Sequence, residues 1–188
     1  NGANARAAKA CAKRWLAAMS ARVRERHAQS GEVAFLLEPD IKEGRGGLRD
    51  VHGLRWAQAA RSILWDTDQP ALDAAYATLL AVRVELHRRT GRPGDKVLLQ
   101  EQDGLADALG YADADVLMGA VARAARTIAW TSDDAWHRID SSLVGPLARA
   151  RRPRDLGGGL RLQDGEVAIA DDVDIAADPA LALSAATA

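Results

Sequence analysis

Apolar residues recur at intervals of three and four over most of the chain, which is the spacing of one face of an α-helix. Five helices are expected from this pattern, at residues 4–29, 48–65, 71–89, 96–109 and about 113–143. Gly110 would end the fourth, and Asp113 or Asp115 would cap the fifth. A short apolar run at residues 32–37 is expected to be extended or buried. The pattern predicts an all-α fold, a bundle of about five helices.

The pattern changes after Gly145 and Pro146. Residues 146–158 are basic and glycine-rich and predict a linker. Residues 159–171 alternate around Asp164-Gly165, a dipeptide that favours a two-residue hairpin turn, with Leu162 opposite Val167 and Leu160 opposite Ile169. Another helix is expected to begin at Asp178-Pro179. The expected organisation is a helical domain at 1–145, the linker, and a short C-terminal β-hairpin with a helix start at 159–188.

Composition narrows the class of protein. The chain has 188 residues, of which 48% are hydrophobic, and a net charge of -1. A dedicated nucleic-acid binder usually carries a basic excess, so no nucleic-acid partner is expected. No apolar run approaches the roughly 18 residues that span a bilayer, so we expect no membrane partner and a cytoplasmic location. Because the chain starts without Met and inside a helical pattern, we expect it to be part of a longer protein.

Known catalytic motifs are missing from the sequence. The histidines lie on four different expected helices, without a second ligand at zinc spacing: His27, His52, His87 and His137. There is no P-loop and no G-x-S-x-G motif. Cys11 lies in an alanine-rich helix and is expected to be a small buried residue. The pairs Asp133-Asp134 and Asp171-Asp172 are expected to be solvated charges. We therefore expect no catalytic residue and no metal site in this chain.

The segment EPDIKEGRGGLRD, at residues 38–50, carries candidate binding chemistry. Gly46 and Gly47 precede an expected helix, where free N–H groups and the helix dipole favour an anion. Lys42 and Arg49 add cationic donors. In the alternative interpretation the segment is a structural turn: the glycines permit a tight backbone, Asp50 caps the helix, and Arg49 pairs with a nearby acid. The residues by themselves leave both interpretations open.

The same segment resembles the one that follows the nucleotidyltransferase domain in bacterial PII uridylyltransferase/uridylyl-removing enzymes. Its ending, Leu48-Arg49-Asp50, favours this family over the glutamine synthetase adenylyltransferases, whose related motif ends in Gly-Gly-Ile-Arg-Glu. Many relatives have Pro where Arg45 stands. Two further stretches are similar to this family: residues 83–111, with Leu-His, Arg, Asp and Leu-Gly-Tyr marks, and residues 162–171 followed by DPALAL.

The resemblance implies a bifunctional enzyme of nitrogen signalling. It would transfer a nucleotidyl group from UTP, or ATP in some lineages, to the PII signal protein and remove it again, with Mg²⁺ in the parent enzyme and no cofactor held by this chain. The chain lacks the Gly-Gly-Ser and paired-Asp motifs of transfer and the His-Asp pair of hydrolysis. It is therefore expected to be an inactive helical middle domain that packs against the parent's nucleotidyltransferase and His-Asp (HD) phosphohydrolase domains.

Three functions fit these residues. In the first, the helical domain closes one wall of the nucleotide site, with Lys42, Gly46, Gly47 and Arg49 as the candidate nucleotide- or anion-binding residues. In the second, it is a non-catalytic spacer or a docking module for PII, and the Gly-Gly turn is only structural. In the third, it is the corresponding domain of a glutamine synthetase adenylyltransferase. The sequence does not distinguish UTP from ATP.

Overall fold

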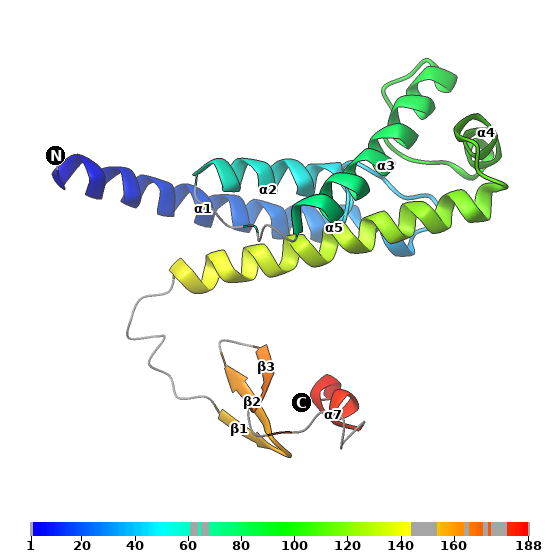
Figure 1. Cartoon of the computed structure of the whole chain (residues 1–188). Helices are drawn as coiled ribbons and strands as arrows, with labels where there is room; N and C mark the ends of the chain where they lie inside the picture. Colours follow the sequence, from blue (N-terminus) through cyan, green and yellow to red (C-terminus); the bar gives the residue numbers. More distant parts are fainter. Residues whose placement is uncertain are drawn as a thin grey trace. The chain divides into compact units, whose positions relative to one another are not determined.

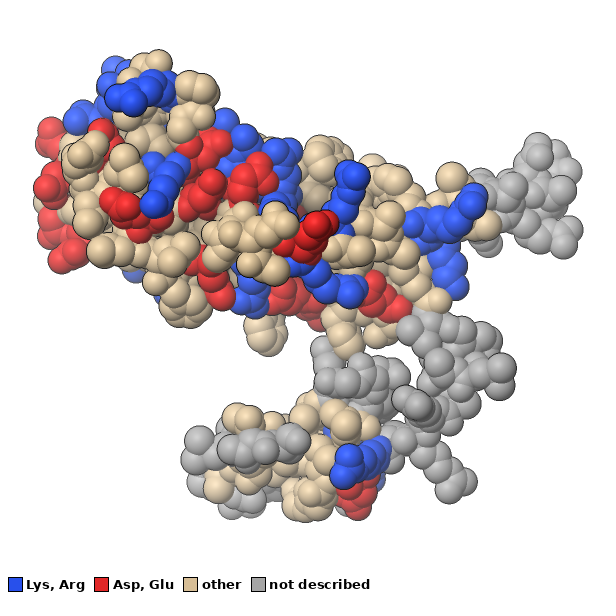
Figure 2. Space-filling view, turned by 180° about the vertical axis from the view of Figure 1, so that it is seen from behind, with Lys and Arg blue, Asp and Glu red and all other residues tan. Residues whose placement is uncertain are grey.

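The computed structural model describes residues 2–60, 64, 68–143, 154–163, 166–170, 173 and 180–187. The chain divides into two compact units, Asn1–Asp140 and Ser141–Ala188. The first unit is helical, and the second contains a small antiparallel sheet. Figure 2 shows basic and acidic side chains interspersed over one face of the first unit, in keeping with the balanced charge of the sequence.

The first unit consists of long helices joined by short connections (Figure 1). The bounds are α1 Gly2–Ser30, α2 Leu48–Ala60, α3 Asp68–Thr90, α4 Leu99–Leu109 and α5 Ala114–Leu143, with a 3-10 turn, η1, at Val33–Phe35. Helices α1, α2 and α5 lie alongside one another, and α3 leads away from them toward α4 (Figure 1). The predicted all-α bundle of about five helices is confirmed.

The core of this unit is aliphatic. Helix α5 contributes a buried series at helical spacing: Leu117, Val121, Ala125, Ile128, Ala135 and Ile139. Helices α2 and α3 contribute a second buried set: Leu48, Val51, Leu54, Leu72, Leu79, Val82 and Leu86. Each series follows one stripe of its helix, so burial of apolar surface in the shared core stabilises the bundle.

The ends of α4 and α5 follow local sequence signals. Gly110 has a φ of +76° at the C-terminus of α4, and its N–H donates to the carbonyls of the preceding turn. A left-handed residue at this position is usually glycine, because a side chain would be strained there. At the start of α5, Asp113 Oδ1 accepts the N–H of Val116 at 2.7 Å. Asp113, and not Asp115, is therefore the cap.

Other helix boundaries differ from the prediction. Helix α4 begins at Leu99, because the N–H of Val97 donates to Pro39 O at 2.9 Å and the N–H of Ile41 to Asp95 O at 3.0 Å. This pairing of distant segments outweighs the helical preference of residues 96–98. Helix α3 begins at Asp68, earlier than predicted. The predicted second helix extends to residues that lie outside the described part, at 61–63 and 65.

The apolar run at residues 32–37 forms η1 and a short extended exit, and most of it is not buried. Val33 lies in the core, whereas Phe35 is 73% exposed and Leu37 is 69% exposed. Leu36 is also exposed. Of the two expected states, Val33 is buried and Leu36 is extended, whereas Phe35 lies in the 3-10 turn and is exposed.

The prediction that Cys11 is buried is also wrong, and one apolar residue of α3 is exposed. Cys11 is exposed and lines a surface hollow together with Ala59 and Ala60, at the end of α2. Val84 on α3 is 56% exposed, whereas Val82 is buried. The valines lie two positions apart on the helix and therefore cannot share the inward face.

The second unit contains three antiparallel strands in the order β1-β2-β3, at Arg154–Gly157, Leu160–Gln163 and Glu166–Ile169, and a short helix α7 at Leu181–Thr187. The predicted pairs Leu162–Val167 and Leu160–Ile169 are confirmed. Strand β1 lies within the range expected to be a linker. Gly157, Gly158 and Gly159 have positive φ and return the chain from β1 to β2. Residues 146–153, the turn 164–165 and the predicted cap at 178–179 lie outside the described residues.

Candidate functional site

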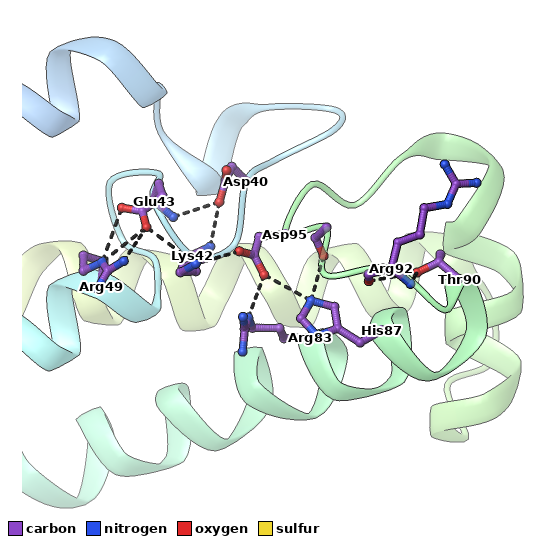
Figure 3. A network of polar contacts seen from close by, with 10 residues as sticks. Asp40, Lys42, Glu43, Arg49, Arg83, His87, Thr90, Arg92 and Asp95 are labelled. Carbon is purple, nitrogen blue, oxygen red and sulfur yellow. Dashed lines mark hydrogen bonds and ion pairs between the residues drawn. The ribbon is translucent and has the colours of Figure 1, made fainter.

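The site is built on the loop of residues 38–47, which connects η1 to α2 and packs against the segment between α3 and α4 (Figure 3). Asp40 organises the loop, because its Oδ1 accepts the N–H groups of Lys42 at 2.9 Å and Glu43 at 2.8 Å. An aspartate that accepts from the backbone two and three residues ahead fixes a tight turn. The backbone of Lys42 and Glu43 is therefore held in one conformation, which fixes the direction in which their side chains point.

The N–H groups at the start of α2 all have partners within the protein. Gly46 N donates to Asp50 Oδ2 at 2.8 Å, and Gly47 N donates to Gly44 O at 2.9 Å. The next two N–H groups, of Leu48 and Arg49, donate at 3.0 Å to the carbonyls of Ile41 and Lys42. These are donors that a helix N-terminus usually offers to an anion. The loop and Asp50 occupy them here, which supports the structural-turn interpretation of the glycines.

Close packing explains why glycine stands at both positions. Gly46 has a φ of +81°, and a Cβ atom there would overlap the carbonyl oxygen of Ala125 on α5. A Cβ at Gly47 would lie 2.8 Å from the carbonyl oxygens of Gly44 and Lys42. The two glycines therefore let the loop fold tightly on itself and approach the backbone of α5.

Asp50 is the common partner in a buried cluster of polar groups, which we call the inner centre. Its side chain is fully buried and accepts from Gly46 N, from the guanidinium of Arg26, and from His27 Nε2 at 2.8 Å. Arg26 and His27 belong to α1, so one carboxylate joins α1, the loop and α2. A buried carboxylate is tolerated only when its charge and lone pairs are satisfied, as they are here.

Asp95 is the common partner in a second, partly exposed cluster, which we call the outer centre. It joins the loop, α3 and the segment between α3 and α4 (Figure 3). Lys42 Nζ contacts its Oδ2 at 3.0 Å, Arg83 Nε donates to its Oδ1 at 2.7 Å, and His87 Nε2 lies 3.2 Å from the same oxygen. Burial raises the pKa of Asp95, but the hydrogen bonds from Lys42 and Arg83 outweigh it and lower the pKa overall. His87 also contacts the carbonyl of Gly94 at 2.9 Å.

Glu43 connects the two basic side chains that the sequence singled out. Arg49 donates to its carboxylate at 2.8 and 3.2 Å, and Lys42 Nζ lies 3.8 Å from it. The hydrogen bond from Arg49 lowers the pKa of Glu43. The prediction that Arg49 pairs with a nearby acid is therefore confirmed. The side chains of Lys42 and Arg49 are 31% and 38% exposed, so both reach solvent beside this carboxylate.

Arg45 links the loop to the segment that follows α1 and to helix α5. Its Nη1 donates to Glu32 at 2.6 Å, and its Nη2 pairs with Asp133 on α5. The hydrogen bond with Asp133 raises the pKa of Arg45. Its backbone also pairs with the segment after α1, since Arg45 N donates to Gly31 O at 2.8 Å and its carbonyl accepts from Val33 N.

His52 on α2 lies at the contact with α3 and has a lowered pKa. Its Nε2 lies 3.3 Å from the hydroxyl of Tyr76 on α3. Burial lowers the pKa of His52, and the nearby charges of Arg49, Arg55 and Arg83 lower it further. The charge of Glu43 acts in the opposite direction, so burial is the main cause of the lowered pKa of His52.

The structure brings together most of the residues that the sequence singled out. Lys42 and Arg49 both contact Glu43. The tight turn at Gly46 and Gly47 lies between them in the chain. Sequence reasoning missed three residues of the outer centre: Asp95, Arg83 and His87. The sequence contained one indication of them, the Leu-His, Arg and Asp marks of residues 83–111. These marks point to the site only when it is known that this segment contacts the loop.

Within the described ranges, no group of three or more His, Cys, Asp or Glu side chains is placed to hold a metal ion. The search for membrane spans covered the same residues and found no helix both long and apolar enough to cross a bilayer.

Comparison with known proteins identifies the family. Residues 14–136 match the family model described as GlnD PII-uridylyltransferase. A Streptomyces coelicolor protein named bifunctional uridylyltransferase/uridylyl-removing enzyme is 42% identical over 179 residues, covering 87% of this chain and 21% of that protein. A Mycobacterium tuberculosis protein of the same name is 39% identical over 168 residues, covering 84% of this chain and 21% of that protein. No solved structure matches.

The match covers the loop, both aspartate centres and most of the helical unit. The chain spans about a fifth of the length of these curated relatives, because its alignment with each covers 21% of the relative. Of the two families that the sequence left open, the comparisons show the first. The chain belongs to the GlnD PII-uridylyltransferase family.

Proposed function

We propose that the parent protein of this chain transfers a uridylyl group from UTP to the PII signal protein and removes it again, in the cytoplasm. The family and the names of the relatives support this proposal. The chain's own part is to form one wall of the nucleotide site, against the nucleotidyltransferase domain of the parent. Because no described group of side chains fits a metal ion, we assign the Mg²⁺ of the transfer reaction to that domain.

The observation that carries this proposal is the meeting of Lys42 and Arg49 at the half-exposed carboxylate of Glu43. Partly exposed ion pairs contribute about 1 kcal/mol or less, so a ligand of higher charge can take over their cations at little cost. A triphosphate has that charge, and guanidinium and ammonium groups are its usual partners.

Side chains, and not the glycine backbone, make the proposed contact. An anion on the N–H groups of Gly46 and Gly47 would have to displace Asp50 and the carbonyl of Gly44. The loop has no comparable barrier to moving Lys42 or Arg49, because both have long flexible side chains. We assign Gly46 and Gly47 the role of positioning these two residues.

The test is steady-state uridylyl transfer by the full-length parent carrying Lys42→Ala or Arg49→Ala. Loss of one charged contact to a phosphate is expected to reduce kcat/KM for UTP by roughly 10- to 100-fold. The control is Arg88→Ala, which removes an exposed arginine that pairs with Glu85 on α3. Unchanged kcat and KM in both loop variants, with a normal melting temperature, would overturn the proposed wall.

A second function is favoured by the occupied N–H groups at the start of α2. If the Gly-Gly turn is purely structural, the domain is a spacer that sets the geometry between two active sites, or a surface that docks PII. The same variants separate the two functions. In a spacer or docking module, Lys42→Ala and Arg49→Ala leave the KM for UTP unchanged, and a docking defect raises the KM for PII alone.

A further inference from the structure

Helices α1 and α2 border two adjoining surface cavities, of about 340 and 460 Å³, which share Trp15 and Trp56 in their walls. We call them together the tryptophan groove. Around the tryptophans, the smaller cavity is lined by Met19, Arg22, Val23, Arg26, Glu43, Arg49 and Gly53. The larger is lined by Cys11, Ala12, Ala59 and Ala60. The groove therefore has one end rich in arginine and one end of small, mostly apolar residues.

The groove is open to solvent although its walls are aromatic. Trp15 is 41% exposed and Trp56 is 53% exposed, in a chain with only 4% aromatic residues. Small alanines and Gly53 line the space beside them, and the ring of His52 lies 6.2 Å from that of Trp56 between centroids. Exposed tryptophans beside a hollow are typical of a site that receives a flat, apolar group.

Charge at the arginine end favours an anion. Three guanidinium groups line it against one carboxylate, that of Glu43. Arg49 pairs with Glu43 and Arg26 with the buried Asp50, whereas Arg22 has no ion-pair partner among the described residues. An incoming phosphate therefore meets one uncommitted arginine and one that shares a half-exposed acid.

The groove is continuous with the site already proposed for the phosphates. Glu43 and Arg49 line the smaller cavity, and the same two residues contact Lys42 or each other in the loop. A single ligand can therefore reach both places if it has a planar apolar part joined to several negative charges. A nucleoside triphosphate has this form.

We propose that the tryptophan groove receives the base of the nucleotide, which stacks on Trp15 and Trp56 while its phosphates extend past Arg49 to Lys42. This inference rests on the proposed function, since it takes the same nucleotide as ligand. Stacking gives affinity without reading the base, because every base has an aromatic face. Discrimination of UTP from other nucleotides then falls to the nucleotidyltransferase domain.

The experiment is calorimetric binding of UTP and of inorganic tripolyphosphate to the full-length parent, in the absence of PII. Variants Trp15→Leu and Trp56→Leu are expected to weaken UTP binding by roughly 5- to 100-fold, as loss of base stacking does. Their affinity for tripolyphosphate stays unchanged, because that ligand has no base. The matched control is Trp130→Leu, which removes a 79% exposed tryptophan of α5 that lines neither cavity.

Failure of this inference is distinguishable from failure of the proposed function. Lys42→Ala tests the phosphate site and should weaken both UTP and tripolyphosphate. If Lys42→Ala has that effect but the tryptophan variants bind UTP normally, the groove is not the base site. If the tryptophan variants lose both ligands and melt at a lower temperature, another part of the parent fills the groove, and the inference is again overturned.

Discussion

The two aspartate centres of the helical unit have similar partners and different surroundings. Asp50 accepts from Arg26, His27 and a backbone N–H, and Asp95 accepts from Arg83, Lys42 and His87. The Asp50 side chain has no exposed surface, whereas that of Asp95 is 11% exposed. Each centre thus combines an arginine and a histidine on one carboxylate, but only the outer one includes a lysine that reaches solvent.

The difference separates a structural role from the binding role that we propose. Every partner of Asp50 is fixed by a helix or by the Gly-Gly turn, so this centre holds α1, the loop and α2 together. Lys42 at Asp95 is partly exposed, as the proposed exchange of one anion for another requires. The same chemical group therefore stabilises the fold where it is sealed and presents a cation where it is half open.

The largest effect is expected from Asp50→Asn, which removes the buried charge and leaves Arg26, whose side chain is only 15% exposed, without its counter-ion. Breaking a buried pair in this way should lower the free energy of unfolding by about 3–5 kcal/mol. Urea denaturation followed by circular dichroism measures it. Asp73→Asn is the control, since Asp73 is 57% exposed in its pair with Arg55 and should change stability by less than about 1 kcal/mol. Equal effects of the two substitutions would contradict the structural role of Asp50.

Gly46→Ala should disrupt the inner centre by moving the backbone N–H that donates to Asp50. It adds a Cβ that overlaps the Ala125 carbonyl and forces alanine to a φ of +81°, so we expect a loss of about 2–4 kcal/mol. Gly91→Ala is the matched control: its φ is +64° but no atom lies within 4 Å of the added Cβ, so its loss should be about 1 kcal/mol. The difference between their urea midpoints measures the close approach of the loop to α5, and equal midpoints would rule that contact out as a source of stability.

The smallest effect on stability is expected at the outer centre, and it should depend on pH. The pKa of Asp95 lies below its unfolded value, so its stabilising contribution is present above about pH 4 and is lost as the pH falls through the folded pKa. Asp95→Asn should cost about 1–2 kcal/mol at pH 7. The pKa of Glu43 is lowered as well, so the variant keeps part of the acid sensitivity. Denaturation at pH 7 and pH 3 should show a smaller difference for the variant than for the unmodified chain, and an equal difference would mean that Asp95 ionises normally.

Local signals were sufficient for much of the fold. Helical spacing located the helices of the first unit, Gly110 located the end of α4, and alternation around residues 164–165 predicted the pairs of β2 and β3. These features depend on residues close in sequence. The exposure of Cys11 and the start of α4 at Leu99 were not predictable in this way, because the first depends on how far α2 extends and the second on pairing with Pro39 and Ile41.

The candidate site divides in the same way. The sequence by itself determined the family, the helical class, and Lys42, Gly46, Gly47 and Arg49 as residues of interest. Only the tertiary structure decided that the glycine N–H groups are occupied, that Asp95, Arg83 and His87 complete the outer centre, and that Trp15 and Trp56 border one groove. The physical reason is that hydrogen-bond partners, burial and cavities are properties of segments far apart in the chain, and a single sequence contains no direct record of which segments meet.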